Sequence, residues 1–136
     1  MAHNPAIIAL DVGEKRIGVA IADPGIRIAI AYDTILVDGT EYDQIRNLIA
    51  AENASTLVVG YPRNQSGEPT LQTKYVEQVA AQLRDAVENL VFQDESLTSV
   101  KAEELLNRQK KPYEKSDIDA LAASLILQDY LEIHHG

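Results

Sequence analysis

The stretch that most constrains this chain is residues 6–23, AIIALDVGEKRIGVAIAD. Two apolar runs rich in β-branched residues flank a short segment that contains Gly13 and the charged residues Glu14, Lys15 and Arg16. This pattern predicts a β-hairpin. Because both runs are almost entirely apolar, we expect both faces of the hairpin to be covered, as in a central sheet with helices on each side.

Asp11 interrupts the first apolar run. An unpaired buried carboxylate is unfavourable, so Asp11 needs a partner, and a metal ion is the leading candidate. The alternative is a turn-forming aspartate in an Asp-x-Gly hairpin, whose side chain bonds the local backbone.

The rest of the chain predicts a third strand followed by alternating helices and strands. The apolar run 27–37 would complete an antiparallel meander with the hairpin. Hydrophobic spacing and capping residues predict the remaining elements: a helix over 42–52 capped by Thr40, a strand over 56–60, a helix over 70–89, a strand over 90–95, a helix over 98–109, and a helix over 117–132 capped by Ser116.

These elements predict an α/β fold with a five-stranded mixed sheet and helices on both faces. A three-strand antiparallel meander would be followed by strands that lie parallel to the first strand. The length of 136 residues is typical of one domain, so we expect residues 1–136 to fold as a single unit.

Three acids are candidates for one site. Asp11 and Glu95 end predicted strands, where open α/β sheets bind ligands. Asp119 lies near the start of the last predicted helix, and the small pair Ala122-Ala123 would let that helix approach the sheet closely. We therefore expect the three carboxylates to converge at one edge of the sheet.

Two of these acids have simpler interpretations. Glu95 follows Asp94. In the alternative interpretation, both are solvated acids that precede a helix N-terminus, where negative charge is favourable. Ser116-x-x-Asp119 has the spacing of a capping box, in which Asp119 would bond only the backbone of its own helix.

Three converging carboxylates need cations, because like charges at short range raise one another's pKa. Oxygen ligands of this kind favour Mg²⁺ or Mn²⁺. Two such ions would activate a water and stabilise the leaving oxygen of a phosphodiester. The pattern therefore indicates a metal-dependent enzyme that acts on phosphate esters.

The net charge of −9, from 21 acidic and 12 basic residues, argues against a protein that coats nucleic acid in general. It is compatible with a metal-dependent enzyme, because bound cations can dominate the charge of a site. Basic residues that are candidates for contacts with substrate phosphate, and otherwise solvated surface charges, are Arg16, Arg63, Lys110, Lys111 and Lys115. Arg16 is also a candidate to hold the Asp11 carboxylate, which is in the same hairpin, by a charge-assisted bond.

The sequence contains few signals that indicate a cellular compartment. The chain has no cysteine, its N-terminus lacks the basic start of a signal peptide, and no apolar run approaches membrane-spanning length. We expect a cytoplasmic protein without membrane contact.

Four stretches resemble the YqgF/RuvX family, bacterial relatives of the RuvC resolvases. They are LDVGEKRIGVAIAD, LVVGYPRNQSGEPT, QDESLTSVKAEELL and KSDIDALAASLILQDYL, in the order and spacing of the family and over nearly the whole chain. The resemblance implies a ribonuclease H-like fold. It also implies that the catalytic, metal-binding acids are Asp11, Glu95 and Asp119.

The sequence departs from the family pattern at three places. Ser96 stands after Glu95 where the family usually has arginine, which would weaken local phosphate attraction, and Ser99 stands where the family usually has threonine. The loop 61–69 carries Tyr61 and Arg63 in place of the commoner Leu-Pro-Leu-Asn, so Arg63 is a candidate compensating phosphate contact.

The leading functional hypothesis is a nuclease with two Mg²⁺ or Mn²⁺ ions that matures the 5′ end of precursor 16S ribosomal RNA, as the resemblance implies. The first alternative is a resolvase of four-way DNA junctions, which requires a symmetric dimer; monomer and homodimer both stay open. A second alternative is a non-catalytic module that binds nucleic acid or the ribosome. The phosphate-binding hairpin of actin-like ATPases fits poorly, because those proteins need two such domains.

Overall fold

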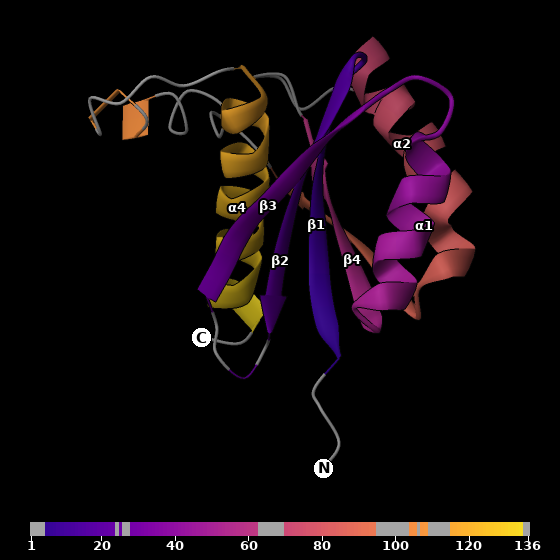
Figure 1. The fold of residues 1–136 in the computed structure, drawn as a ribbon, viewed down its shortest axis with the longest axis horizontal. Coiled ribbons are helices and arrows are strands. Elements are labelled where there is room, and N and C mark those ends of the chain that lie inside the picture. Colours follow the sequence, from indigo (N-terminus) through magenta and orange to yellow (C-terminus); the bar gives the residue numbers. More distant parts are fainter. Residues whose placement is uncertain are drawn as a thin grey trace.

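The computed structural model describes residues 5–23, 25, 28–62, 70–94, 104–105, 107–108 and 115–134. Within them, five strands form one sheet with helices on both sides (Figure 1). The strands are β1 (Ala6–Val12), β2 (Arg16–Asp23), β3 (Ile28–Leu36), β4 (Ala54–Tyr61) and β5 (Asn89–Asp94). The helices are α1 (Glu41–Ala51), α2 (Leu71–Leu83), the 3-10 turn η1 (Arg84–Ala86) and α4 (Lys115–His134).

The strand order is β3-β2-β1-β4-β5. Strands β1, β2 and β3 pair antiparallel, whereas β4 runs parallel to β1 and β5 runs parallel to β4. The predicted meander followed by parallel strands is therefore confirmed. The predicted helix over 98–109 lies mostly outside the described residues.

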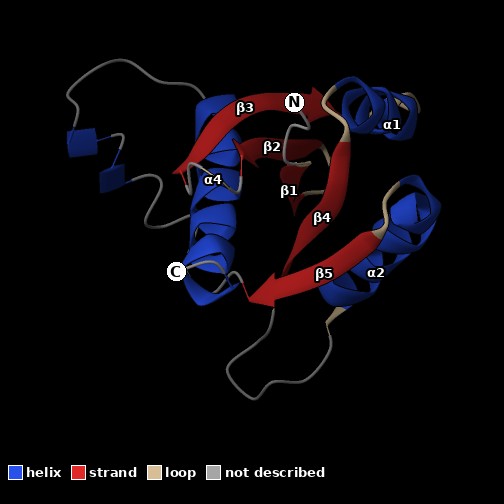
Figure 2. Cartoon of the chain, turned by 90° about the horizontal axis from the view of Figure 1, so that it is seen from below, coloured by secondary structure: helices blue, strands red, loops and turns tan. Residues whose placement is uncertain are grey.

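Strand alternation divides the core into two layers (Figure 2). On one face, large side chains such as Ile8 and Leu10 of β1 pack against α1 and α2. On the other face, smaller side chains such as Ala9 of β1 and Ala20 of β2 pack against α4. This small-residue face lets α4 lie close to the sheet.

The second helix is shorter than the predicted range 70–89. It ends at Leu83, and Val87 is already extended because the chain enters β5 at Asn89. Leu71, the first residue of the helix, is 85% exposed although it is apolar. The buried position in that first turn is Thr73 instead.

The N-terminus of α2 is held by reciprocal bonds between two threonines. The Thr70 hydroxyl accepts from the Thr73 backbone N–H at 3.2 Å, and the Thr73 hydroxyl accepts from the Thr70 N–H at 3.1 Å. The Gln72 side chain then donates to the carbonyl oxygen of Val12 at 2.8 Å, which joins α2 to the end of β1. These bonds fix α2 beside the hairpin.

Thr40, the predicted cap of α1, precedes that helix but makes no side-chain cap bond. Its hydroxyl donates to Asp38 Oδ1 at 2.6 Å, and this bond lowers the pKa of Asp38. The prediction failed because a neighbouring carboxylate competes for the hydroxyl.

No helix within the described residues is long and apolar enough to cross a bilayer.

We expect Thr70→Ala to lower the free energy of unfolding by about 1 kcal/mol, because α2 loses its N-terminal cap. Urea titration followed by circular dichroism measures the change. Thr40→Ala is the matched control, and we expect it to stay within about 0.5 kcal/mol because that hydroxyl caps no helix. Equal losses in the two variants would contradict the capping role of Thr70.

Candidate active site

Asp11 lies near the carboxyl end of β1 and is partly buried. Strand alternation places it on the same face as Ile7 and Ala9, which belong to the α4 layer. The apolar residues on either side of it, Leu10 and Val12, belong to the opposite layer. The carboxylate of Asp11 therefore lies on the side of the sheet that α4 covers.

Gly18 is the residue of β2 that lies directly opposite Asp11. A Cβ atom at Gly18 would lie 1.9 Å from the backbone oxygen and 2.3 Å from the backbone carbon of Asp119. The backbone of α4 therefore rests against β2 at this point. Since paired residues of an antiparallel ladder project to the same face, Asp11 and Asp119 lie on the same side of the sheet, beside Gly18.

Gly18 was not among the site residues predicted from the sequence. The available signal was a glycine inside a run that otherwise reads as a strand, which marks a bulge or a close approach of another backbone.

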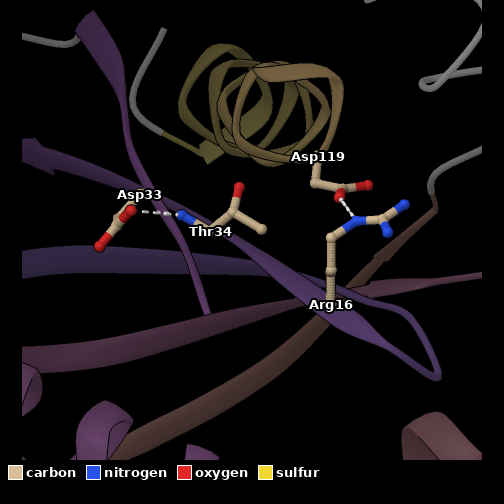
Figure 3. Close-up of polar contacts among 4 residues, drawn as sticks. All are labelled: Arg16, Asp33, Thr34 and Asp119. Atoms are coloured by element: carbon tan, nitrogen blue, oxygen red, sulfur yellow. Dashed lines mark hydrogen bonds and ion pairs between the residues drawn. The ribbon is translucent and has the colours of Figure 1, made fainter. Parts of the chain in front are cut away.

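Asp119 is joined to Arg16, the first residue of β2 (Figure 3). Arg16 Nε donates to Asp119 Oδ2 at 2.6 Å, and the two side chains are 33% and 23% exposed. Ion pairs with substantial exposure contribute about 0–1 kcal/mol. This pair therefore orients the carboxylate without locking it in place.

The predicted capping box at the start of the last helix is wrong. Helix α4 begins at Lys115, so Ser116 lies inside the helix and cannot act as its cap. Asp119 is the fifth residue of the helix, and an oxygen of its side chain bonds Arg16 across 103 positions of sequence.

The donor set is suited to a divalent cation. Two carboxylates share a sheet face beside a glycine whose missing side chain leaves room for α4, and carboxylate oxygens are preferred ligands of Mg²⁺. The described residues contain no group of three acids or histidines placed to hold a metal. Glu95, the third expected acid, directly follows β5 and lies outside the described residues.

Most of the predicted phosphate-binding residues also lie outside the described part of the chain. Arg63, Lys110 and Lys111 are among them, and the side chain of Lys115 is not described either. Lys115 is the first residue of α4, and Asp119 lies in the next turn of the same helix.

Two tyrosines, Tyr75 of α2 and Tyr42 of α1, belong to the opposite layer. Burial raises the pKa of Tyr75, and the negative charges of Glu41 and Glu14 raise it further. Burial also raises the pKa of Tyr42. Both phenols stay neutral at physiological pH, and because they pack with the α1 and α2 layer, the sheet separates them from Asp11 and Asp119.

We expect Gly18→Ala to displace the start of α4, because the new methyl group meets backbone atoms that cannot rotate away. The loss of stability should be about 1–3 kcal/mol. Amide shifts of Asp119 and Ala120 in a ¹⁵N correlation spectrum report the displacement.

Gly39→Ala is the control for this substitution. Gly39 has a φ of +100°, so alanine is strained there, but no atom lies within 4 Å of the new methyl group. This variant should lose stability without moving the α4 amides. Unchanged α4 amides in Gly18→Ala would show that the helix does not rest on Gly18.

The chain is similar to known proteins over nearly its full length. A model of the family RuvX, described as Holliday junction resolvase, matches residues 5–133. A candidate pre-16S rRNA nuclease of Chloroflexus aurantiacus is 46% identical over 135 residues, which cover 96% of this chain and 88% of the relative. A relative of the same name from Synechocystis is 38% identical over 141 residues, covering 100% and 93% of the two chains.

Solved structures of Thermus thermophilus RuvC share the fold. RuvC in complex with a Holliday junction substrate superposes with a TM-score of 0.55 at 15% identity, covering 97% of this chain and 96% of that one. This likeness confirms the predicted ribonuclease H-like α/β fold. The family match and the identity to its relatives together show that the chain belongs to the RuvX family.

Proposed function

We propose that this chain is a divalent-metal-dependent nuclease that processes the 5′ end of precursor 16S ribosomal RNA, with residues 1–136 acting as one nuclease domain. Family membership makes it a nuclease, that is, a hydrolase acting on ester bonds. The relatives from Chloroflexus and Synechocystis are named for precursor 16S rRNA. That substrate exists in the cytoplasm, which is where we place the reaction.

One observation carries the proposal: Asp11 and Asp119 lie on one face of the sheet beside Gly18, at the carboxyl end of β1. Ligands of open α/β sheets bind at this end of the strands. Both acids are only partly exposed. Two carboxylates on the same face at this end of a strand can both supply oxygen ligands to a divalent cation.

Asp11, Asp119 and Glu95 would hold Mg²⁺ or Mn²⁺, with two ions expected. When bound, the ions activate the attacking water and stabilise the leaving oxygen of the phosphodiester. The inclusion of Glu95 rests on its place in sequence directly after β5. On the same face, Val91 of β5 packs in the α4 layer, and strand alternation gives Gln93 the same side.

Basic side chains of this protein also have roles in the proposed reaction. Arg16 holds one oxygen of Asp119 and so orients the carboxylate before a metal arrives. Arg63, Lys110, Lys111 and Lys115 are proposed contacts to substrate phosphates on sequence grounds. They would attract RNA locally to a protein whose net charge is −9.

Cleavage of four-way DNA junctions is the second candidate, because the family model and the RuvC complex both refer to Holliday junctions. Paired cuts in a junction need two active sites related by symmetry. A monomer in sedimentation would disfavour this candidate, whereas maturation of one RNA end needs a single site.

The test compares cleavage of an end-labelled precursor 16S rRNA fragment with that of a four-way DNA junction, in Mg²⁺, in Mn²⁺ and in chelator. We expect metal-dependent cutting of the RNA. Asp11→Asn and Asp119→Asn should each lower the rate at least about 100-fold, the scale of losing one electrostatic group of an active site.

Asp33→Asn is the matched control for the loss of one carboxylate. Asp33 is an exposed acid of β3 whose Oδ1 accepts from the Thr34 backbone N–H at 2.7 Å, and it lies apart from the Arg16–Asp119 pair (Figure 3). It should cut at the wild-type rate. Faster cutting of the junction would favour the resolvase, and RNA binding without cutting would favour a non-catalytic module.

A further inference from the structure

Arg16 and a metal ion need the same carboxylate. Arg16 Nε donates a charge-assisted hydrogen bond to Asp119 Oδ2 at 2.6 Å. Arg16 and Gly18 lie two residues apart on β2, and alternation places them on the same face. The guanidinium therefore extends to Asp119 from the strand that faces Asp11 across the ladder.

The positive charge of Arg16 lies beside a carboxylate that is also a candidate metal ligand. Asp11 and Asp119 lie on the same face beside Gly18, and the guanidinium of Arg16 offsets the negative charge of Asp119. A divalent ion bound by these carboxylates would take over that role, and its charge would repel the guanidinium.

Arg16 is able to leave the carboxylate. One third of its side chain is exposed, and it extends from the first residue of a strand beside the hairpin tip. Its flexible stem can turn without any change in the backbone. A released guanidinium is the side chain best suited to grip a phosphate, because its planar fork matches two phosphate oxygens.

We propose that Arg16 is a stand-in cation for Asp119: a divalent ion displaces its guanidinium, which then binds a phosphate of the nucleic acid substrate. Metal loading thereby strengthens substrate binding, and by thermodynamic linkage the substrate strengthens metal binding. This inference rests on the proposed function, since it assigns Arg16 a second partner in the same site.

The first test measures Mn²⁺ binding to the metal-free full chain by calorimetry, without nucleic acid. Arg16→Gln removes the competing cation, so we expect Mn²⁺ to bind at least about 5-fold more tightly than to the wild type. Arg16→Lys keeps the charge and should stay near the wild type. Circular dichroism verifies that each variant is folded.

Lys15→Gln is the matched control for net charge. Lys15 is an exposed cation next to Arg16, so its loss alters the total charge equally without touching Asp119. Its Mn²⁺ affinity should stay within about 2-fold of the wild type, because an exposed charge is screened by salt. An affinity of Arg16→Gln equal to or weaker than that of Lys15→Gln would overturn the exchange and leave Arg16 a purely structural partner of Asp119.

The second test measures binding of a precursor 16S rRNA fragment by fluorescence anisotropy, with and without Ca²⁺ as a divalent ion that supports binding but little turnover. Ca²⁺ should tighten RNA binding to the wild type and to Lys15→Gln, and much less to Arg16→Gln. An equal gain in all three proteins would overturn the transfer of Arg16 to phosphate.

The two proposals fail separately. The Mn²⁺ titration requires neither substrate nor turnover, so inactivity toward RNA with the expected change in Mn²⁺ affinity would count against the proposed function alone. Metal-dependent RNA cleavage with an unchanged Mn²⁺ affinity in Arg16→Gln would count against the role of Arg16 alone.

Discussion

The contact between the backbone of α4 and Gly18 of β2 is the constraint on which the rest of the site depends. A side chain at this position would meet the carbonyl of Asp119 at 1.9 Å, so only glycine permits the observed approach. Gly18 also lies opposite Asp11 in the ladder. One missing methyl group therefore sets where the last helix meets β2 opposite Asp11, although Asp11 and Asp119 are 108 positions apart in sequence.

One face of the sheet packs the larger hydrophobic side chains, and the other face carries the charged side chains of the candidate site. Ile, Leu and Val side chains fill the layer under α1 and α2, where their bulk holds the sheet at the usual distance from its helices. Alanines line much of the other face, so α4 packs closely and brings polar side chains near the strands. Asp11 and Arg16 project from this thinner layer, where both side chains are only partly buried.

Capping patterns were the weakest part of the prediction. Thr40 and Ser116 both stand where a cap was expected, yet Thr40 bonds Asp38 and Ser116 lies inside α4. The Thr40 hydroxyl had a carboxylate acceptor two residues away, and the last helix begins one residue before Ser116, so short spacing rules did not identify either cap. By contrast, Thr70 caps α2 through reciprocal bonds with Thr73, a pair that the sequence pattern did not single out.

The sequence by itself determined the strands, their mixed arrangement and Asp11 as an acid within an apolar strand, because the periodicity of hydrophobic residues can be read from short stretches of the chain. It also indicated the family, because four stretches spread over the chain resemble the family pattern. Only the tertiary structure decided that Asp119 bonds Arg16 rather than a helix cap, and that Gly18 is the point of contact. Those facts depend on how a helix docks on a sheet, which is set by the shapes of two surfaces brought together from opposite ends of the chain.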